Sequence, residues 1–240
     1  MGYLPIFVDA GGRPCVVIGG GEIAERKTRS LVDASAEVTV VSPSLTAGLA
    51  AMARRNTIRH RARTYRPGDL EGAFLAFEAS GKVETERAAA AEARARGVLI
   101  NVADVPDLCS FIAPAVIKRG GLQIAVSTGG ASPAFARKIR EELEDRFGLE
   151  YELMIDLLAA ARQWLQAREH DLGARTRLLT ALVRSDLREC LHRADLAAAE
   201  ATVHRLLGAS FAELGFDPAL PSAALDRPSS ATNRRAGKSR

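Results

Sequence analysis

The first half of the chain alternates short apolar runs with stretches of helix-forming composition. The apolar runs, which we expect to be strands, cover residues 15–18, 38–41, 73–77 and 98–102. Strands that are apolar at nearly every position are typical of a parallel sheet covered on both faces. Helices are expected between them over residues 22–34 and 83–96, the second because it consists largely of Ala, Glu and Arg. This alternation predicts an α/β fold with crossover helices over residues 1–113.

The pattern changes after residue 113. Residues 122–127 alternate like a strand, and a helix is expected to follow with Ser132 as its N-cap and Pro133 at its first position. We therefore expect a small α+β unit over residues 114–148. Residues 149–216 have apolar positions at helical spacing and predict a helical region. Residues 217–240 are rich in Ser, Pro, Ala and Arg, which predicts a disordered tail.

A glycine-rich turn follows the first predicted strand and leads directly into a helix. Its sequence is Gly19-Gly20-Gly21-Glu22-Ile23-Ala24, which fits the pattern G-x-G-x-x-A. Gly19 permits a tight turn, Gly21 lets the backbone approach a pyrophosphate, and Ala24 lets helix and strand pack closely. The helix N-terminus adds amide donors and a partial positive charge. Because a second strand follows on schedule, the segment predicts a Rossmann-type domain that binds a dinucleotide.

The end of the second predicted strand bears on which dinucleotide is bound. An acidic residue there would bind the adenine ribose, whereas an arginine would accept the 2′-phosphate of NADP. Neither type is present, because Val41 is followed by Ser42, Pro43 and Ser44, and residues 42–53 contain no arginine. NAD is therefore the expected cofactor, with Ser42 and Ser44 as ribose contacts.

Two polar residues lie near the carboxyl end of the last predicted strand of this region. Asn101 and Asp104 fall where ligands of open α/β sheets bind, and we expect Asn101 to contact the cofactor. Asp104 could take a proton in a reaction that also delivers a hydride to nicotinamide. It could equally cap the turn that opens at Val105-Pro106-Asp107. The residues alone leave both roles open.

Composition bears on the ligands and the cellular compartment that we expect for this chain. The formal net charge is +4, but five basic residues lie in residues 227–240, so nucleic-acid binding is not expected. No run of eighteen apolar residues predicts a membrane span. Three widely spaced cysteines and no recognisable signal peptide favour the cytoplasm. The four histidines lack the spacing of a metal site, so no resident metal is expected.

Four segments in this order closely resemble the precorrin-2 dehydrogenases, including the N-terminal module of sirohaem synthase. They are residues 1–7, 15–27, 101–114 and 125–133. The resemblance covers roughly residues 1–145. It implies NAD-dependent oxidation of precorrin-2 to sirohydrochlorin, and in some members ferrous iron is also inserted to give sirohaem. It further implies a homodimer in which the unit after Pro114 mediates dimerisation.

The resemblance also assigns roles to individual residues. It implies that Asp104 serves the chemistry and that Glu22, Ile23, Pro43 and Ser44 contact the cofactor. The tetrapyrrole substrate carries many carboxylates, so cations and helix N-termini should bind it. The candidates for this role are Ser127, Thr128, Gly129, Gly130, Arg137 and Lys138. For Arg137 and Lys138 a solvated helix face is the alternative.

The chain departs from the family pattern after its third apolar run. Family members usually have a small residue there, then Thr and Asp or Asn, whereas this chain has Glu78-Ala79-Ser80-Gly81-Lys82. Because this loop borders the cofactor in the family, a chelatase that has lost redox turnover is one alternative function. A regulatory module that senses NAD(H) without catalysis is another. The motifs at residues 101–114 and 127–133 favour an enzyme, since a sensor would need only the glycine turn.

Overall fold

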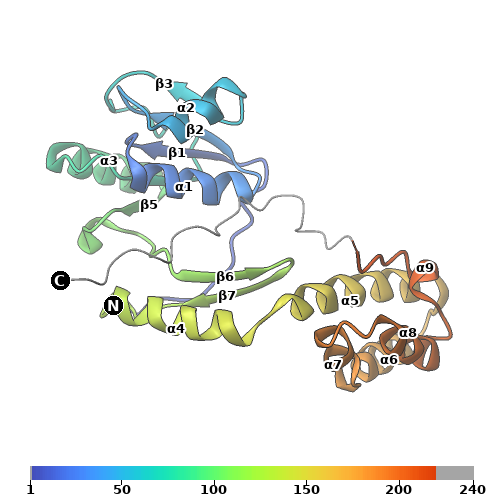
Figure 1. The fold of residues 1–240 in the computed structure, drawn as a ribbon. Helices are drawn as coiled ribbons and strands as arrows, with labels where there is room; N and C mark the ends of the chain where they lie inside the picture. The colour runs from blue at the N-terminus through green and yellow to red at the C-terminus, as the bar shows by residue number, and fades with distance from the viewer. Residues whose placement is uncertain (1, 220–240) are drawn as a thin grey trace, which may run out of the picture. The chain divides into compact units, whose positions relative to one another are not determined.

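In the computed structural model, which describes residues 2–219, the chain divides at Ala113 and Pro114. Residues 2–113 form one compact unit together with residues 129–131. Residues 114–128 and 132–219 form the other. Figure 1 shows both units, with most of their helices and strands labelled.

The first unit contains a five-stranded parallel sheet with helices along it (Figure 1). Its elements in chain order are β1 (Pro14–Ile18), α1 (Glu22–Asp33), β2 (Glu37–Val41), α2 (Ala47–Arg54), β3 (Arg59–Arg61), β4 (Leu75–Glu78), α3 (Val83–Arg96), β5 (Leu99–Val102) and the short 3₁₀ helix η1 (Pro106–Leu108). The strand order is β3-β2-β1-β4-β5, which is the open α/β arrangement that the apolar runs predict.

Strand register brings the functional segments to one edge of this sheet. Ile18, the last residue of β1, lies opposite Val41 of β2 and Glu78 of β4. Phe77 of β4 lies opposite Asn101 of β5. Because all five strands are parallel, the segments that follow β1, β2, β4 and β5 leave the sheet at its carboxyl edge, which is where ligands bind in such folds.

Both faces of the sheet are buried, as continuous apolar strands require. One face packs against α1 and α2 through Val17, Val40, Leu31 and Leu49. The other packs against α3 through Ile18, Ile100 and the alanines of that helix. The alanines Ala89, Ala90 and Ala93 allow α3 to approach the strands closely.

The main differences from expectation concern polar or short elements. Strand β4 runs over residues 75–78, so it begins two residues later than expected and includes Glu78. Strand β3 and helix α2 were not predicted. The sequence of β3, Arg59-His60-Arg61, has no apolar pattern, and it forms a strand because Thr39, Val40 and Val41 of β2 pair with it.

The second unit begins with a β-hairpin covered by a helix. Strands β6 (Ala115–Arg119) and β7 (Leu122–Val126) are antiparallel, and helix α4 (Pro133–Arg146) packs on both. The predicted cap is confirmed, because the Ser132 hydroxyl accepts the N–H of Phe135 at 3.2 Å. At the other end of α4, the Arg119 guanidinium donates to the carbonyl oxygens of Phe147 at 2.8 Å and Glu144 at 3.2 Å. This satisfies carbonyls that a helix C-terminus leaves unpaired.

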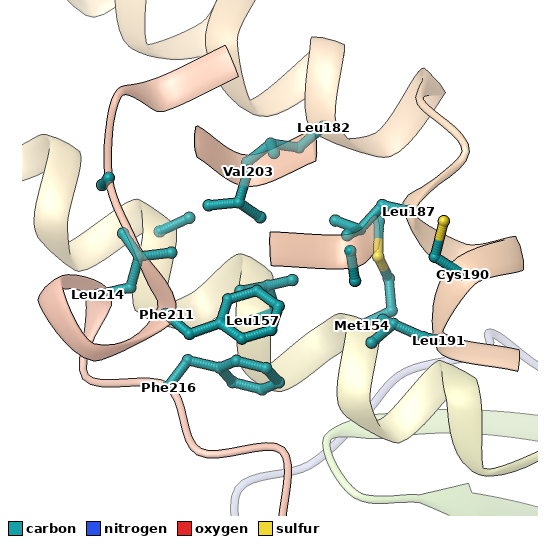
Figure 2. Close-up of a cluster of buried hydrophobic side chains, with 13 residues drawn as sticks. Met154, Leu157, Leu182, Leu187, Cys190, Leu191, Val203, Phe211, Leu214 and Phe216 are labelled. Atoms are coloured by element: carbon teal, nitrogen blue, oxygen red, sulfur yellow. The ribbon is translucent and has the colours of Figure 1, made fainter. Parts of the chain in front are cut away.

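The rest of this unit is helical and has a hydrophobic core of its own. The helices are α5 (Leu149–Arg168), α6 (Leu172–Arg184), α7 (Leu187–His192), α8 (Leu196–Leu207) and α9 (Phe211–Leu214). Figure 2 shows the core, in which Leu157, Leu182, Leu187 and Val203 are fully buried. The rings of Phe211 and Phe216 meet edge to face at 5.0 Å between centroids. Residues 220–240, most of the expected disordered tail, lie outside the described residues.

Candidate functional site

The three glycines after β1 occupy different environments. Gly19 has a φ of +114°, and a Cβ on it would lie 2.5 Å from the carbonyl oxygen of Ala79. A Cβ on Gly20 would lie 1.9 Å from the carbonyl oxygen of Ser44. A Cβ on Gly21 would meet no atom of the protein within 4 Å. The first two glycines therefore allow the loops to pack, while the third leaves open space above the helix.

That open space fits the phosphates of a dinucleotide. Gly21 is the N-cap of α1 and, lacking a side chain, does not cap the first-turn amides. The Glu25 carboxylate, which could compete for them, instead accepts hydrogen bonds from Thr46 and Arg29, and these lower its pKa. Glu22 and Ile23 are exposed beside the turn, whereas Ala24 is fully buried against the sheet. An uncapped helix N-terminus behind a glycine with free space is a site for an anion.

The predicted ribose contacts after β2 differ in their exposure. Ser42 is 5% exposed, and its hydroxyl donates to the carbonyl oxygen of Ser44 at 2.7 Å. Ser42 thus shapes the loop that Gly20 packs against. Pro43 and Ser44 are exposed and available to a ligand. The role of all three in cofactor binding stays a prediction.

An arginine from outside residues 42–53 lies beside this loop in the fold. Arg61 is opposite Val41 in the β2–β3 register, and its carbonyl oxygen accepts the N–H of Ser42 at 3.2 Å. The guanidiniums of Arg61 and Arg63 both donate to the buried carboxylate of Asp69, at 2.7 Å and 2.6 Å. Burial tends to raise the pKa of Asp69, but hydrogen bonds from Arg63, the Arg66 N–H and Arg61 lower it to about 2. Both arginines are therefore committed to a permanently charged carboxylate.

Asn101 and Asp104 lie at and beyond the end of β5. The Asn101 amide donates to the carbonyl oxygen of Phe111 at 3.1 Å, which ties it to the segment after η1. Asp104 is exposed and has a φ of +62°, a conformation uncommon for residues other than glycine. Among the described residues, no backbone N–H donates to its carboxylate within hydrogen-bond distance, so Asp104 does not cap the turn that follows. Its catalytic role stays a prediction.

The loop that departs from the family pattern contains a buried carboxyl group. Glu78 is 1% exposed and its Oε1 accepts the N–H of Ser80 at 2.9 Å. Its Oε2 is buried and finds no hydrogen-bond partner among the described residues. Burial raises the pKa of Glu78, and the nearby Glu86 acts in the same direction. The loop still packs on the glycine turn, because the Ala79 N–H donates to the carbonyl oxygen of Ile18 at 2.8 Å.

The predicted substrate-binding residues Ser127, Thr128, Gly129 and Gly130 lie between β7 and α4. The Thr128 hydroxyl donates to the carbonyl oxygen of Ser132 and accepts its N–H, each at 3.0 Å. Ser127 is exposed, and Gly129 and Gly130 have φ values of +63° and +89°. These residues form a compact turn before α4, and their contact with substrate stays a prediction.

The two cations proposed for substrate binding are exposed on α4. Arg137 pairs with Glu141 at 3.0 Å and Lys138 with Glu142 at 3.7 Å, each one helical turn away. Such exposed pairs contribute little to stability and would open readily to an incoming carboxylate. They suit a solvated helix face as well as a substrate site.

The described residues contain neither a membrane-spanning helix nor a metal-binding cluster. No helix there is both long and apolar enough to cross a membrane. No group of three or more His, Cys, Asp or Glu side chains there could hold a metal ion.

Two segments of the chain match known domain families. Residues 6–115 match the family described as “Putative NAD(P)-binding”. Residues 119–146 match the family described as “Sirohaem biosynthesis protein central”. The glycine turn and Asp104 fall within the first match, and the turn at residues 127–133 falls within the second.

The curated relatives are longer than this chain. The siroheme synthase of Methylobacillus flagellatus is 42% identical over 168 residues, covering 70% of this chain and 36% of the relative. That of Chromobacterium violaceum is 37% identical over 213 residues, covering 89% of this chain and 45% of the relative. The chain thus spans less than half the length of these proteins. Among solved structures, “SirC, precorrin-2 dehydrogenase” has a TM-score of 0.69 at 24% identity and covers 83% of this chain and 100% of its own. At this identity the likeness establishes the fold.

Proposed function

We propose that the chain oxidises precorrin-2 to sirohydrochlorin with NAD, because residues 6–115 match an NAD(P)-binding family and residues 119–146 match the central domain of sirohaem biosynthesis proteins. The observation that carries the proposal is the carboxyl edge of the parallel sheet. An uncapped helix N-terminus with free space at Gly21 and an uncommitted carboxylate on Asp104 belong to segments that leave this same edge.

The glycine turn would bind the cofactor through its backbone. The amides at Glu22 and Ile23 would donate to the pyrophosphate, while Pro43 and Ser44 would contact the adenosine end. When bound, NAD supplies the acceptor for the hydride that leaves the substrate. Gly21 matters because any side chain there would occupy the space above the helix.

Asp104 would remove the proton that must leave together with the hydride. The reaction takes two hydrogens from precorrin-2, and the products are sirohydrochlorin, NADH and a proton. An exposed carboxylate that no backbone amide engages among the described residues can accept that proton and release it to water. The left-handed backbone at Asp104 fixes where the side chain leaves the loop.

The proposal extends to the choice of cofactor, the cellular location, the assembly and iron insertion. NAD is preferred to NADP because Arg61 and Arg63 are already paired with Asp69. The chain acts in the cytoplasm as a homodimer, with residues 114–148 as the dimerisation unit. Ferrous iron would be a second substrate, inserted into sirohydrochlorin to give sirohaem.

The proposal is tested with the purified chain, precorrin-2 and NAD under anaerobic conditions. We expect NADH absorbance to rise in proportion to the sirohydrochlorin formed. A parallel reaction with sirohydrochlorin and ferrous iron measures chelation. Sirohaem formation without any NADH formation would instead favour the chelatase-only alternative, and NAD binding without either reaction would favour the sensor.

A further inference from the structure

A lysine that sequence reasoning passed over lies on the inner flank of α1. Ala24, Thr28 and Leu31 form the buried face of this helix, and Lys27 stands beside them, half-buried. Its ammonium lies 5.0 Å from the centre of the Phe77 ring, near the carboxyl end of β4. Glu25, two residues earlier, faces Thr46 at the start of α2 instead. The side chain of Lys27 therefore extends toward β4 and β5.

The surroundings of Lys27 connect it to the proposed catalytic edge. Phe77 lies opposite Asn101 in the β4–β5 register, and its ring meets that of Phe111 at 5.5 Å between centroids. Asp104 follows three residues after Asn101, and the Ala103 N–H donates to the carbonyl oxygen of Glu78 at 2.9 Å. The ammonium thus shares this end of the sheet with Asp104.

The charge on Lys27 is not neutralised by a close partner. No carboxylate of the described residues lies within 4 Å of its ammonium. Burial lowers the pKa of Lys27, and Arg26 acts in the same direction, while Cys109 and Asp104 oppose them. A partly desolvated cation without an ion pair is costly, and an anion that binds beside it offsets that cost.

We propose that Lys27 binds a carboxylate of the tetrapyrrole substrate next to Asp104. The inference rests on the proposed function, and it adds a substrate-binding residue on the dinucleotide-binding domain itself. The substrate fits because it carries several acidic side chains around a flat, apolar ring. Phe111, which is partly exposed and packs on the buried ring of Phe77, supplies neighbouring apolar surface.

The other available anion is the pyrophosphate of the cofactor, and the geometry favours it less. The amides at the α1 N-terminus already provide its site. Lys27 lies more than one helical turn further along, and its ammonium sits over a β4 side chain rather than over Gly21.

The test measures binding in the absence of turnover. Sirohydrochlorin is titrated against the purified full chain without NAD, and NAD is titrated separately. The variants are Lys27→Met, which removes the charge, and Lys27→Arg, which keeps it. Arg26→Met is the matched control, because it removes the same charge from an exposed position one residue away. Melting temperatures establish that each variant is folded.

We expect Lys27→Met to weaken sirohydrochlorin binding on the order of tenfold or more, as loss of a charge-assisted contact does. Lys27→Arg should stay within a few-fold of the wild type, and Arg26→Met should match it. NAD affinity should be unchanged in all three variants. If Lys27→Met weakens NAD binding and leaves sirohydrochlorin binding intact, the anion is the cofactor phosphate and the proposal is wrong. Unchanged binding of both ligands would also overturn it.

The result also separates this inference from the proposed function. If the wild-type chain and Lys27→Met bind sirohydrochlorin equally well, only the role of Lys27 is contradicted. A wild-type chain that does not bind sirohydrochlorin contradicts both. If Lys27→Met does not fold, Lys27→Arg and Lys27→Gln decide the question, because only the first retains the charge.

Discussion

At the scale of single residues, neighbouring glycines in one turn have separable roles. Gly20 is required by the fold, since its Cβ would collide with the backbone at Ser44. Gly21 is not required by the fold in the same way, because a Cβ there would meet no protein atom within 4 Å. The sequence motif alone does not make this distinction, which depends on the packing of the β2–α2 loop.

The first prediction follows from the free space at Gly21. Gly21→Asp should abolish NAD binding, because its carboxylate would occupy and repel the pyrophosphate position. The same change should leave the melting temperature equal or slightly higher, since Asp is a good N-cap for α1. Calorimetric titration of NAD and thermal unfolding measure the two effects. Equal NAD affinity of variant and wild type would mean that the turn has only a structural role.

The second prediction concerns Asp69 and cofactor choice. Asp69→Asn should release Arg61 and Arg63 from their charged partner and raise the affinity for NADP relative to NAD by about tenfold, or ~1.4 kcal/mol. The readout is the ratio of NADP affinity to NAD affinity, because Asp69→Asn is also expected to lower the stability of the chain. Removing one partner of a buried ion pair is destabilising.

The control for Asp69 is Glu37→Gln. Glu37 pairs with Arg59 at 3.5 Å near the start of β2 and β3, the opposite end from the cofactor edge. Its loss should leave the NADP-to-NAD ratio unchanged. A ratio that does not move in Asp69→Asn would show that these arginines do not face the ribose.

At the scale of elements, the apolar runs predicted most of the sheet and the glycine motif predicted how β1 meets α1. The runs at residues 15–18, 38–41 and 98–102 lie within one residue of strands β1, β2 and β5. Strand β3 could not be found in this way because its residues are polar. Arg61, the last residue of β3, was missed with it, since only strand pairing places this residue beside Ser42. Lys27 was missed for a similar reason, because the packing of α1 on the sheet decides toward which strands its side chain extends.

The third prediction concerns the end of β4, where Glu78 is buried. A carboxyl whose pKa is raised in the folded state supports stability below its unfolded pKa and loses that contribution as pH rises through the folded value. Glu78→Gln removes the cost of ionising this group. It should therefore stabilise the chain at pH 8 by roughly 1–3 kcal/mol relative to wild type, the usual cost of an unsatisfied buried polar group.

Denaturant unfolding at pH 8 and pH 4 measures this effect. The difference between Glu78→Gln and wild type should shrink at pH 4, where Glu78 is protonated. Glu84→Gln, at an exposed position in the first turn of α3, should show no such difference. If Glu78→Gln is less stable than wild type at pH 8, the ionised carboxylate has a favourable partner and the assignment is wrong.

The fourth prediction concerns the helical core shown in Figure 2. Leu157 of α5 is fully buried among residues of the other helices. Leu157→Ala should lower the free energy of unfolding by about 3 kcal/mol through lost burial and a residual cavity. Leu172→Ala, at a position that is 69% exposed, should change it by less than about 0.5 kcal/mol. Similar effects of both changes on denaturant unfolding would contradict the existence of a shared core.

At the scale of the whole molecule, two units carry different parts of the proposed function. The first contains the glycine turn, Asp104 and Lys27, and the second contains Ser127, Thr128 and the cations of α4. The candidate residues of the first unit lie at the sheet edge that the sequence indicates. Those of the second depend on contacts with substrate, so neither sequence nor side-chain packing within the unit decides their role.

The most direct test of the account is the activity of Asp104→Asn. Asn retains the size of the side chain and some hydrogen bonding but cannot accept the proton. We expect NADH formation from precorrin-2 to fall by roughly 10²–10⁴-fold, with NAD affinity and melting temperature unchanged. Asp107→Asn, three residues along the same segment and also exposed, is the matched control and should keep wild-type turnover. Turnover of Asp104→Asn close to that of wild type would contradict the account, because the carboxylate at the edge of the sheet would then take no part in the reaction.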